Sequence, residues 1–64
     1  MDTHTHWQSQ GHRVATYDWG TGEVTTVEGD VIAKGAGTTA DAEAEVRDFF
    51  DVPVIKERRV NLGR

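Results

Sequence analysis

The chain combines a length of 64 residues with a complete absence of cysteine, and this combination limits what it can fold into. A domain this small buries only about 60% of the surface that its unfolded chain exposes, so hydrophobic gain barely exceeds the entropy cost of ordering. Small domains commonly compensate with disulfides or a structural zinc site. Without cysteine, disulfides, cysteine-based zinc fingers and thiol catalysis are all excluded. The sequence therefore predicts one small soluble domain that a partner chain helps to stabilise.

Charge is distributed unevenly along the chain, whose formal net charge is −4. Residues 41–51 hold five acidic side chains against one arginine, whereas residues 52–64 hold three arginines and one lysine against one acidic side chain. An acidic and a basic segment can attract each other within the fold or between copies of the chain. The sequence pI of about 5.1 makes duplex nucleic acid an unlikely partner, because duplex binding usually needs a basic face.

Membrane and export patterns are missing from the sequence. No apolar run approaches the roughly 18 residues that a membrane span needs. The first residues lack the basic segment followed by an apolar stretch that marks a secretory signal. We therefore expect no membrane contact and a location in the cytoplasm or within a particle.

Residues 1–11, MDTHTHWQSQG, are predicted to form a polar N-terminal arm. Trp7 is their only large apolar side chain apart from the initiator methionine, and they show neither a strand period nor a helix period. Residues 12–60 are predicted to form the single folded domain, and residues 61–64 a C-terminal tail.

The first half of the domain predicts a β-hairpin. Residues 12–19 alternate and are rich in β-branched and aromatic side chains, which favours a strand. Asp18 and Gly22 are typical of a turn, and a second strand is expected over residues 23–28.

Gly29-Asp30 leaves two interpretations open for the chain that follows. A two-residue type II′ turn would add a third strand over residues 31–34 and pair Val27 with Ile32. A bulge at Gly29 would instead continue one long strand. The turn chemistry of a glycine at the first central position favours the first interpretation.

A helix is predicted between Thr38 and Pro53. Thr38 or Thr39 is the N-cap, and with Thr38 the side chain of Asp41 falls at a capping-box position. Pro53 ends the helix because it forces the preceding residue out of the α region. Apolar residues at i, i+4, i+7 and i+8 predict the buried side, namely Ala42, Val46, Phe49 and Phe50.

Residues 54–60 predict the last strand. Both of its faces carry charge, which is typical of an edge strand that discourages unwanted pairing. The fold class is therefore α+β: a small antiparallel sheet, formed by a hairpin or a three-strand meander and the final edge strand, with one helix packed on it.

Histidines supply the weak candidates for a metal site. His4 and His6 are two residues apart, so in an extended arm both imidazoles lie on one side, with His12 or Asp2 as a third ligand. Zinc needs three or four converging ligands, which a polar arm does not hold in place. We therefore expect no cofactor and no bound metal.

Catalytic patterns are weaker still. Ser9 is the only serine and lies in the predicted arm, where no scaffold holds it against a base. Gly35-Ala36-Gly37 precedes the helix but lacks the phosphate-loop pattern, and Asp41 and Glu43 in the first turn would repel an anion. We expect the protein not to be an enzyme.

Aromatic and basic side chains supply the candidate interface. Trp7 is the expected anchor of the arm on another chain, because its own domain is predicted to offer it little cover. The candidate interface residues are Trp7, Trp19, Lys56, Arg58 and Arg59.

The sequence favours a non-catalytic structural or interaction module within a larger assembly, such as an accessory protein of a viral particle. Its partner is expected to be another protein chain, either further copies of itself or a larger assembly. Two alternatives remain. One is a small regulator that binds a protein or nucleic acid through the basic C-terminal strand and tail. The other is a metal-binding histidine arm on an inert domain.

Overall fold

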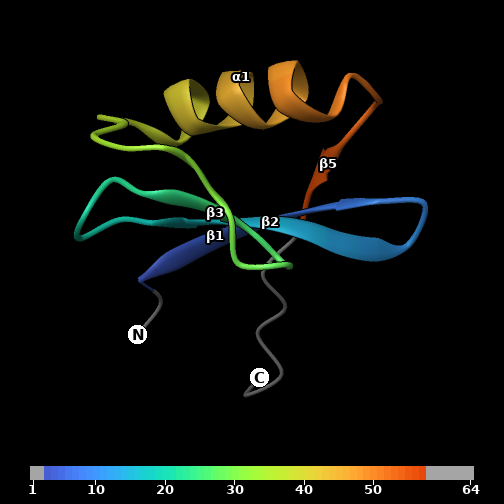
Figure 1. Ribbon diagram of the computed structural model, residues 1–64, viewed down its shortest axis with the longest axis horizontal. Helices are drawn as coiled ribbons and strands as arrows, with labels where there is room; N and C mark the ends of the chain where they lie inside the picture. The colour runs from blue at the N-terminus through green and yellow to red at the C-terminus, as the bar shows by residue number, and fades with distance from the viewer. Residues whose placement is uncertain (1–2, 58–64) are drawn as a thin grey trace, which may run out of the picture.

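The computed structural model describes residues 3–57, which form a five-stranded antiparallel sheet with one helix packed on it (Figure 1). The strand order in the sheet is β4-β3-β2-β1-β5. This confirms the predicted α+β fold and adds a strand at its N-terminal end. The elements in chain order are β1 (His4–Ser9), β2 (His12–Asp18), β3 (Val24–Thr26), β4 (Val31–Ala33), α1 (Thr39–Phe50) and β5 (Ile55–Lys56).

The N-terminal segment is the largest departure from the sequence prediction, because its residues form β1 and not a polar arm. β1 lies between β2 and β5, inside the sheet. Trp7 is 0% exposed and lies opposite Ala15 of β2. The expectation that Trp7 anchors the chain on a partner is therefore wrong, since the indole belongs to this domain's own core.

A two-residue turn joins β1 to β2. Gln10 and Gly11 both have positive φ, 55° and 82°, as type I′ hairpin turns require. The sequence did not predict this hairpin, because Trp7 is the only apolar side chain of β1. In most strands several alternating apolar side chains pack against the core, but in β1 only the indole of Trp7 does so. The hydrophobic pattern of the sequence therefore shows no period of two there.

The chain turns between β3 and β4, so Gly29-Asp30 is not a bulge within one long strand. The Gly29 N–H donates to the Thr26 carbonyl at 2.9 Å, and the Thr26 N–H donates to the Asp30 carbonyl at 2.8 Å. The loop is longer than the two residues predicted, because residues 27–30 all lie outside the strands.

The predicted pairing of Val27 with Ile32 is consequently wrong. Thr25 lies opposite Val31, and after a shift of register Val24 lies opposite Ala33.

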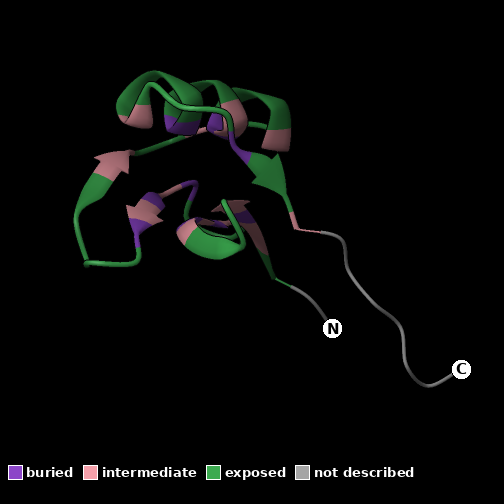
Figure 2. Cartoon of the chain, turned by 90° about the vertical axis from the view of Figure 1, so that its right-hand side faces the viewer, coloured by how far each residue is buried: buried purple, intermediate pink, exposed green. Residues whose placement is uncertain are grey.

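The core lies between α1 and the sheet face that the helix covers (Figure 2). Tyr17 belongs to it, and its hydroxyl donates to the Ala36 carbonyl at 2.9 Å. This contact connects the C-terminal end of β2 to the loop before α1. The buried hydrophobic residues are Trp7, Ala15, Tyr17, Val24, Ala42, Val46 and Val54.

The helix ends match the sequence prediction. The Asp41 N–H donates to the Thr38 hydroxyl at 3.1 Å, so Thr38 is the N-cap. At the other end Asp51 adopts a left-handed conformation, and its N–H donates to the Arg47 carbonyl at 3.0 Å. Pro53 follows two residues later, where it cannot continue the helix.

The buried side of α1 differs from the prediction at Phe49. Ala42 and Val46 are buried and Phe50 packs against the core, whereas Phe49 is 53% exposed. Positions 42, 46 and 50 repeat every four residues along one side, and Phe49 lies about 100° around the helix from Phe50. Its ring packs edge-on against Phe50, with centroids 5.0 Å apart.

β5 pairs antiparallel with β1 and is an edge strand, as predicted. Lys56 lies opposite Trp7, and the Glu57 N–H donates to the His6 carbonyl at 2.8 Å. The strand is shorter than the predicted 54–60, because Val54 and Glu57 lie outside it. Residues 58–60, with Arg58 and Arg59, and the predicted tail lie outside the described residues.

Candidate interaction surface

Polar side chains that bond to one another line the sheet face opposite α1. His6 Nδ1 lies 2.8 Å from the Thr16 hydroxyl, and His4 Nε2 lies 3.5 Å from an Asp18 carboxylate oxygen. The His4 and His6 rings stack with centroids 6.1 Å apart. The two imidazoles do lie on one side, as expected, but they belong to a strand and bond to their neighbours on β2.

His12 is not brought to this pair. It begins β2 beside the turn and lies opposite Ser9, at the far end of the hairpin from His4. Within residues 3–57 no three histidine, aspartate or glutamate side chains are placed to hold a metal ion. His4 and His6 instead contact Asp18 and Thr16 on the neighbouring strand.

Arg13 and Glu57 form a bidentate ion pair that connects β2 to the end of β5. Arg13 Nε and Nη2 donate to the two carboxylate oxygens at 3.0 and 2.8 Å. These hydrogen bonds hold the pKa of Glu57 below its usual value, with His6 adding to the effect, and raise the pKa of Arg13. The pair spans β1, so it holds the short edge strand β5 on the sheet.

Acid should remove this contribution to stability. Because the pKa of Glu57 is lowered in the folded state, the stabilisation is present above the unfolded pKa of about 4.3 and is lost as pH falls through the lowered value. We expect Arg13→Ala to lower stability at pH 7 by at most about 1 kcal/mol, since both side chains are partly exposed. Thermal melts against pH should show the parent and variant curves converging in acid. A constant gap at all pH values would contradict this role of the pair.

Of the predicted interface residues, Trp19 and Lys56 lie on the surface. Trp19 is 50% exposed, and its indole N–H donates to the Thr5 hydroxyl at 2.7 Å. Its backbone N–H donates to the Thr3 carbonyl, just before β1. Lys56 is exposed on β5, opposite the middle of β1.

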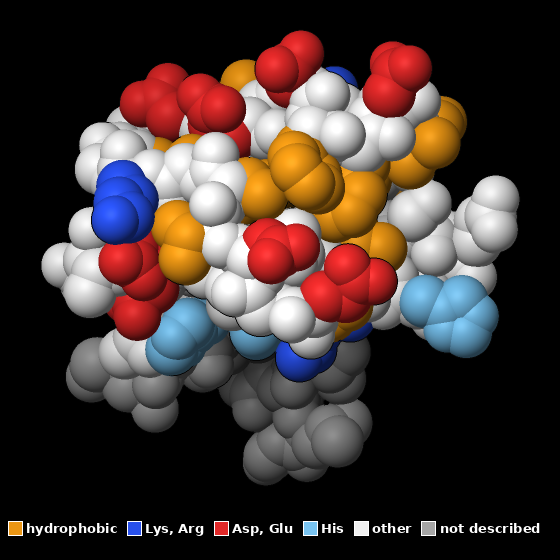
Figure 3. Space-filling view, viewed as in Figure 1, with side chains coloured by type: hydrophobic (Ala, Val, Ile, Leu, Met, Phe, Trp, Pro, Cys, Tyr) orange, Lys and Arg blue, Asp and Glu red, His pale blue; other side chains and the backbone are white. Residues whose placement is uncertain are grey.

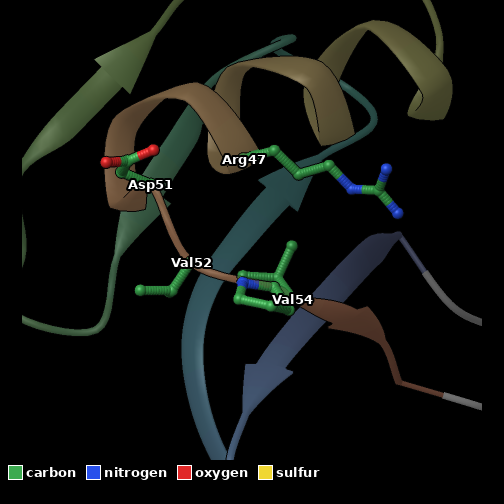
Figure 4. A pocket seen from close by; sticks show the side chains of 5 residues that line it. Arg47, Asp51, Val52 and Val54 are labelled. Carbon is green, nitrogen blue, oxygen red and sulfur yellow. The ribbon is translucent and has the colours of Figure 1, made fainter.

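Two open hollows flank the helix. The larger, about 450 Å³, lies under its C-terminal end, where Arg47 and Asp51 point away from each other (Figure 4). Arg47 is bound to Glu43 at 2.7 Å, as the i, i+4 spacing predicts. The smaller, about 320 Å³, lies between the helix and the loop after β4 and includes Lys34, Asp41 and Glu45. The side chains that line the two hollows include no serine, histidine or tyrosine.

β4 offers a different kind of surface, which the sequence analysis did not single out. It is the last strand of the sheet on its side, so one of its edges has no strand partner among residues 3–57. Its three residues, Val31, Ile32 and Ala33, carry no charge, and Val31 is 45% exposed. Val27 in the adjoining turn is 60% exposed. We call Val27 together with β4 the β4 edge.

In Figure 1 the segment of β4 (green) lies on the face of the molecule turned to the viewer, where the chain crosses in front of the other strands. The same view in space-filling form shows a band of hydrophobic side chains with acidic side chains above and below it (Figure 3). An apolar band bordered by charge is typical of a protein contact surface.

Comparison with known proteins gives no family model, no curated protein and no solved structure that matches this chain. Within the described part of the chain, no helix has both the length and the apolar character required to cross a membrane. The function therefore has to be inferred from the surfaces described above.

Proposed function

We propose that the protein is a non-catalytic interaction module, which binds another protein chain within a larger assembly through the β4 edge. The observation that carries this proposal is the uncharged, unpaired edge of β4, with Val31 exposed on the strand and Val27 exposed in the turn that precedes it.

The physical argument rests on the unpaired backbone groups of an edge strand. Such a strand presents a row of N–H and C=O groups that can pair with another chain, and natural proteins usually block it with charged side chains. β5 at the opposite edge contains Lys56 and lies beside the Arg13–Glu57 ion pair. Within β4 itself no side chain is charged, so a partner strand can approach it without desolvating a charge.

Burial of apolar side chains supplies the affinity. Full burial of one valine side chain contributes on the order of 1.5 kcal/mol or more. Val27 and Val31 are each about half exposed or more, so a partner that covers them gains part of that amount at each. By contrast, the histidine, threonine and aspartate side chains on the sheet face opposite α1 bond to one another, which supports a structural role for them.

Site-specific photo-crosslinking tests the proposal. A photoreactive amino acid at Val31 is compared with the same group at Ala40, which is exposed on α1, in cells that naturally produce the protein. We expect the probe at Val31 to give one defined crosslinked protein, identified by mass spectrometry, and the probe at Ala40 to give none. Equal products from both positions, or none from Val31, would show that the β4 edge is not the contact surface.

A further inference from the structure

We infer that the occupant of the β4 edge is a second copy of this chain, paired antiparallel with β4 about a two-fold axis near Ile32. This inference rests on the proposed function and specifies its partner. The evidence is the placement of charge at the two ends of the strand.

β4 is bounded by one acidic and one basic residue at equal distance from its centre. The sequence reads Asp30-Val31-Ile32-Ala33-Lys34, so each charge lies two residues from Ile32. Both charged residues are exposed. Neither side chain forms an ion pair with another described residue, so both are available to a partner.

Antiparallel pairing makes these charges complementary. With Ile32 opposite Ile32, Asp30 of one copy lies opposite Lys34 of the other, and the two-fold axis repeats the pair at the other end. Opposite charges on facing cross-strand positions stabilise a pairing, whereas like charges there destabilise it. A parallel arrangement in the same register would place Asp30 beside Asp30 and Lys34 beside Lys34. The charges therefore favour one direction and one register.

The shape of β4 sets the strength of this contact. The strand is three residues long, and its pairing with β3 shifts register between the partners of Val24 and Thr25. An irregular, short edge supports only limited pairing, because bulges bend the strand and interrupt the hydrogen-bond ladder. We therefore expect a weak, reversible dimer whose population rises with protein concentration.

Charge-reversal variants test the register directly. Asp30→Lys places lysines opposite each other at both ends, and Lys34→Asp places aspartates there, so each variant alone should associate about tenfold more weakly than the parent. A mixture of the two variants restores both opposite-charge pairs, so it should form a heterodimer at least as strong as the parent dimer. The double variant should likewise regain self-association. Analytical ultracentrifugation over a wide concentration series measures the parent, the two single variants, their mixture and the double variant.

Matched controls distinguish the effect of the pairing register on association from the effects of net charge and of unfolding. Glu28→Lys changes the net charge as Asp30→Lys does, and Lys56→Asp changes it as Lys34→Asp does, but neither position lies in the proposed pairing. Asp30 uses its backbone groups to bond with Thr26, so its replacement leaves those hydrogen bonds in place. Thermal melts should confirm that every variant is folded.

Two results would overturn the inference: a parent chain that stays monomeric at every concentration, or single variants that associate as the parent does without preference in the mixture. If either occurs while the probe at Val31 crosslinks to a different protein, the proposed function stands and only the second copy is rejected. If the probe at Val31 also gives no product, the proposed function fails as well.

Discussion

Trp7→Ala should leave the protein with little or no stability at room temperature. The indole is fully buried between the sheet and α1, and replacement of a buried tryptophan by alanine typically costs about 3–5 kcal/mol. Domains are stable by only about 5–15 kcal/mol, and one of this size belongs at the lower end. Circular dichroism should show loss of the cooperative melt. Deletion of residues 1–11 should have the same result, because it removes the strand that separates β2 from β5.

Two control variants make the role of the indole specific. Trp19→Ala removes a tryptophan that is half exposed, so we expect a loss of about 1 kcal/mol from its bond to Thr5. Trp7→Phe keeps most of the buried ring but removes the indole N–H, which has no acceptor among the described residues. The unpaired buried donor costs about 1–3 kcal/mol, which offsets part of the lost ring volume, so Trp7→Phe should remain folded. A Trp7→Ala protein that melts like the parent would contradict the burial of Trp7 in the core and favour the interface role that the sequence predicted for it.

Gly22→Ala should be the second severe substitution. Gly22 is buried with a φ of +78°, and a Cβ built there would lie 3.0 Å from the Gly35 Cα and 3.1 Å from the Ala36 nitrogen. These are backbone atoms, and the Ala36 N–H donates to the Gly22 carbonyl at 3.0 Å, so the two loops cannot separate without breaking that bond. Left-handed strain and overpacking together should cost about 2–5 kcal/mol.

Gly35→Ala is the matched control for this effect. Gly35 has nearly the same φ, +75°, but a Cβ there meets nothing within 4 Å. It should therefore lose only the conformational contribution of about 1–2 kcal/mol. Chemical denaturation measures both variants, and equal losses would show that the close approach of the two loops does not matter.

Local sequence signals predicted the parts of the fold that depend on near neighbours. Thr38 and Asp41 identified the helix start, and their hydrogen bond is present. Asp18 identified the turn after β2, where its carboxylate accepts the Gly20 N–H at 2.8 Å. Such contacts involve residues two to four positions apart, so the pattern that predicts them is contained in the sequence itself.

The pairing of strands that lie far apart in the chain could not be predicted from such local signals. β1 has a single apolar side chain, so only its partners on both sides show that it is a strand. Phe49 and Phe50 both fit a helical period, and only the position of the sheet decides which of them packs against the core.

The candidate site depends on topology in the same manner. Val31–Ala33 becomes an edge because the chain, after α1, returns to β1 and not to β4. No local feature of residues 31–33 reports where a strand twenty residues later will pair. The sequence does contain the symmetric placement of Asp30 and Lys34. This placement indicates a pairing surface only once β4 is known to be an edge strand.

The pairing of β5 with β1 also has a consequence for synthesis of the chain on the ribosome. The first strand made is completed by the last, so the outer edge of β1 stays unpaired until Ile55 and Lys56 have left the exit tunnel. Val54, which belongs to the cluster around Trp7, arrives at the same late stage. Contacts between such distant parts of the chain form slowly and together. The nascent protein therefore completes its sheet only in a late step, and fragments that end before β5 are open to chaperones and proteases.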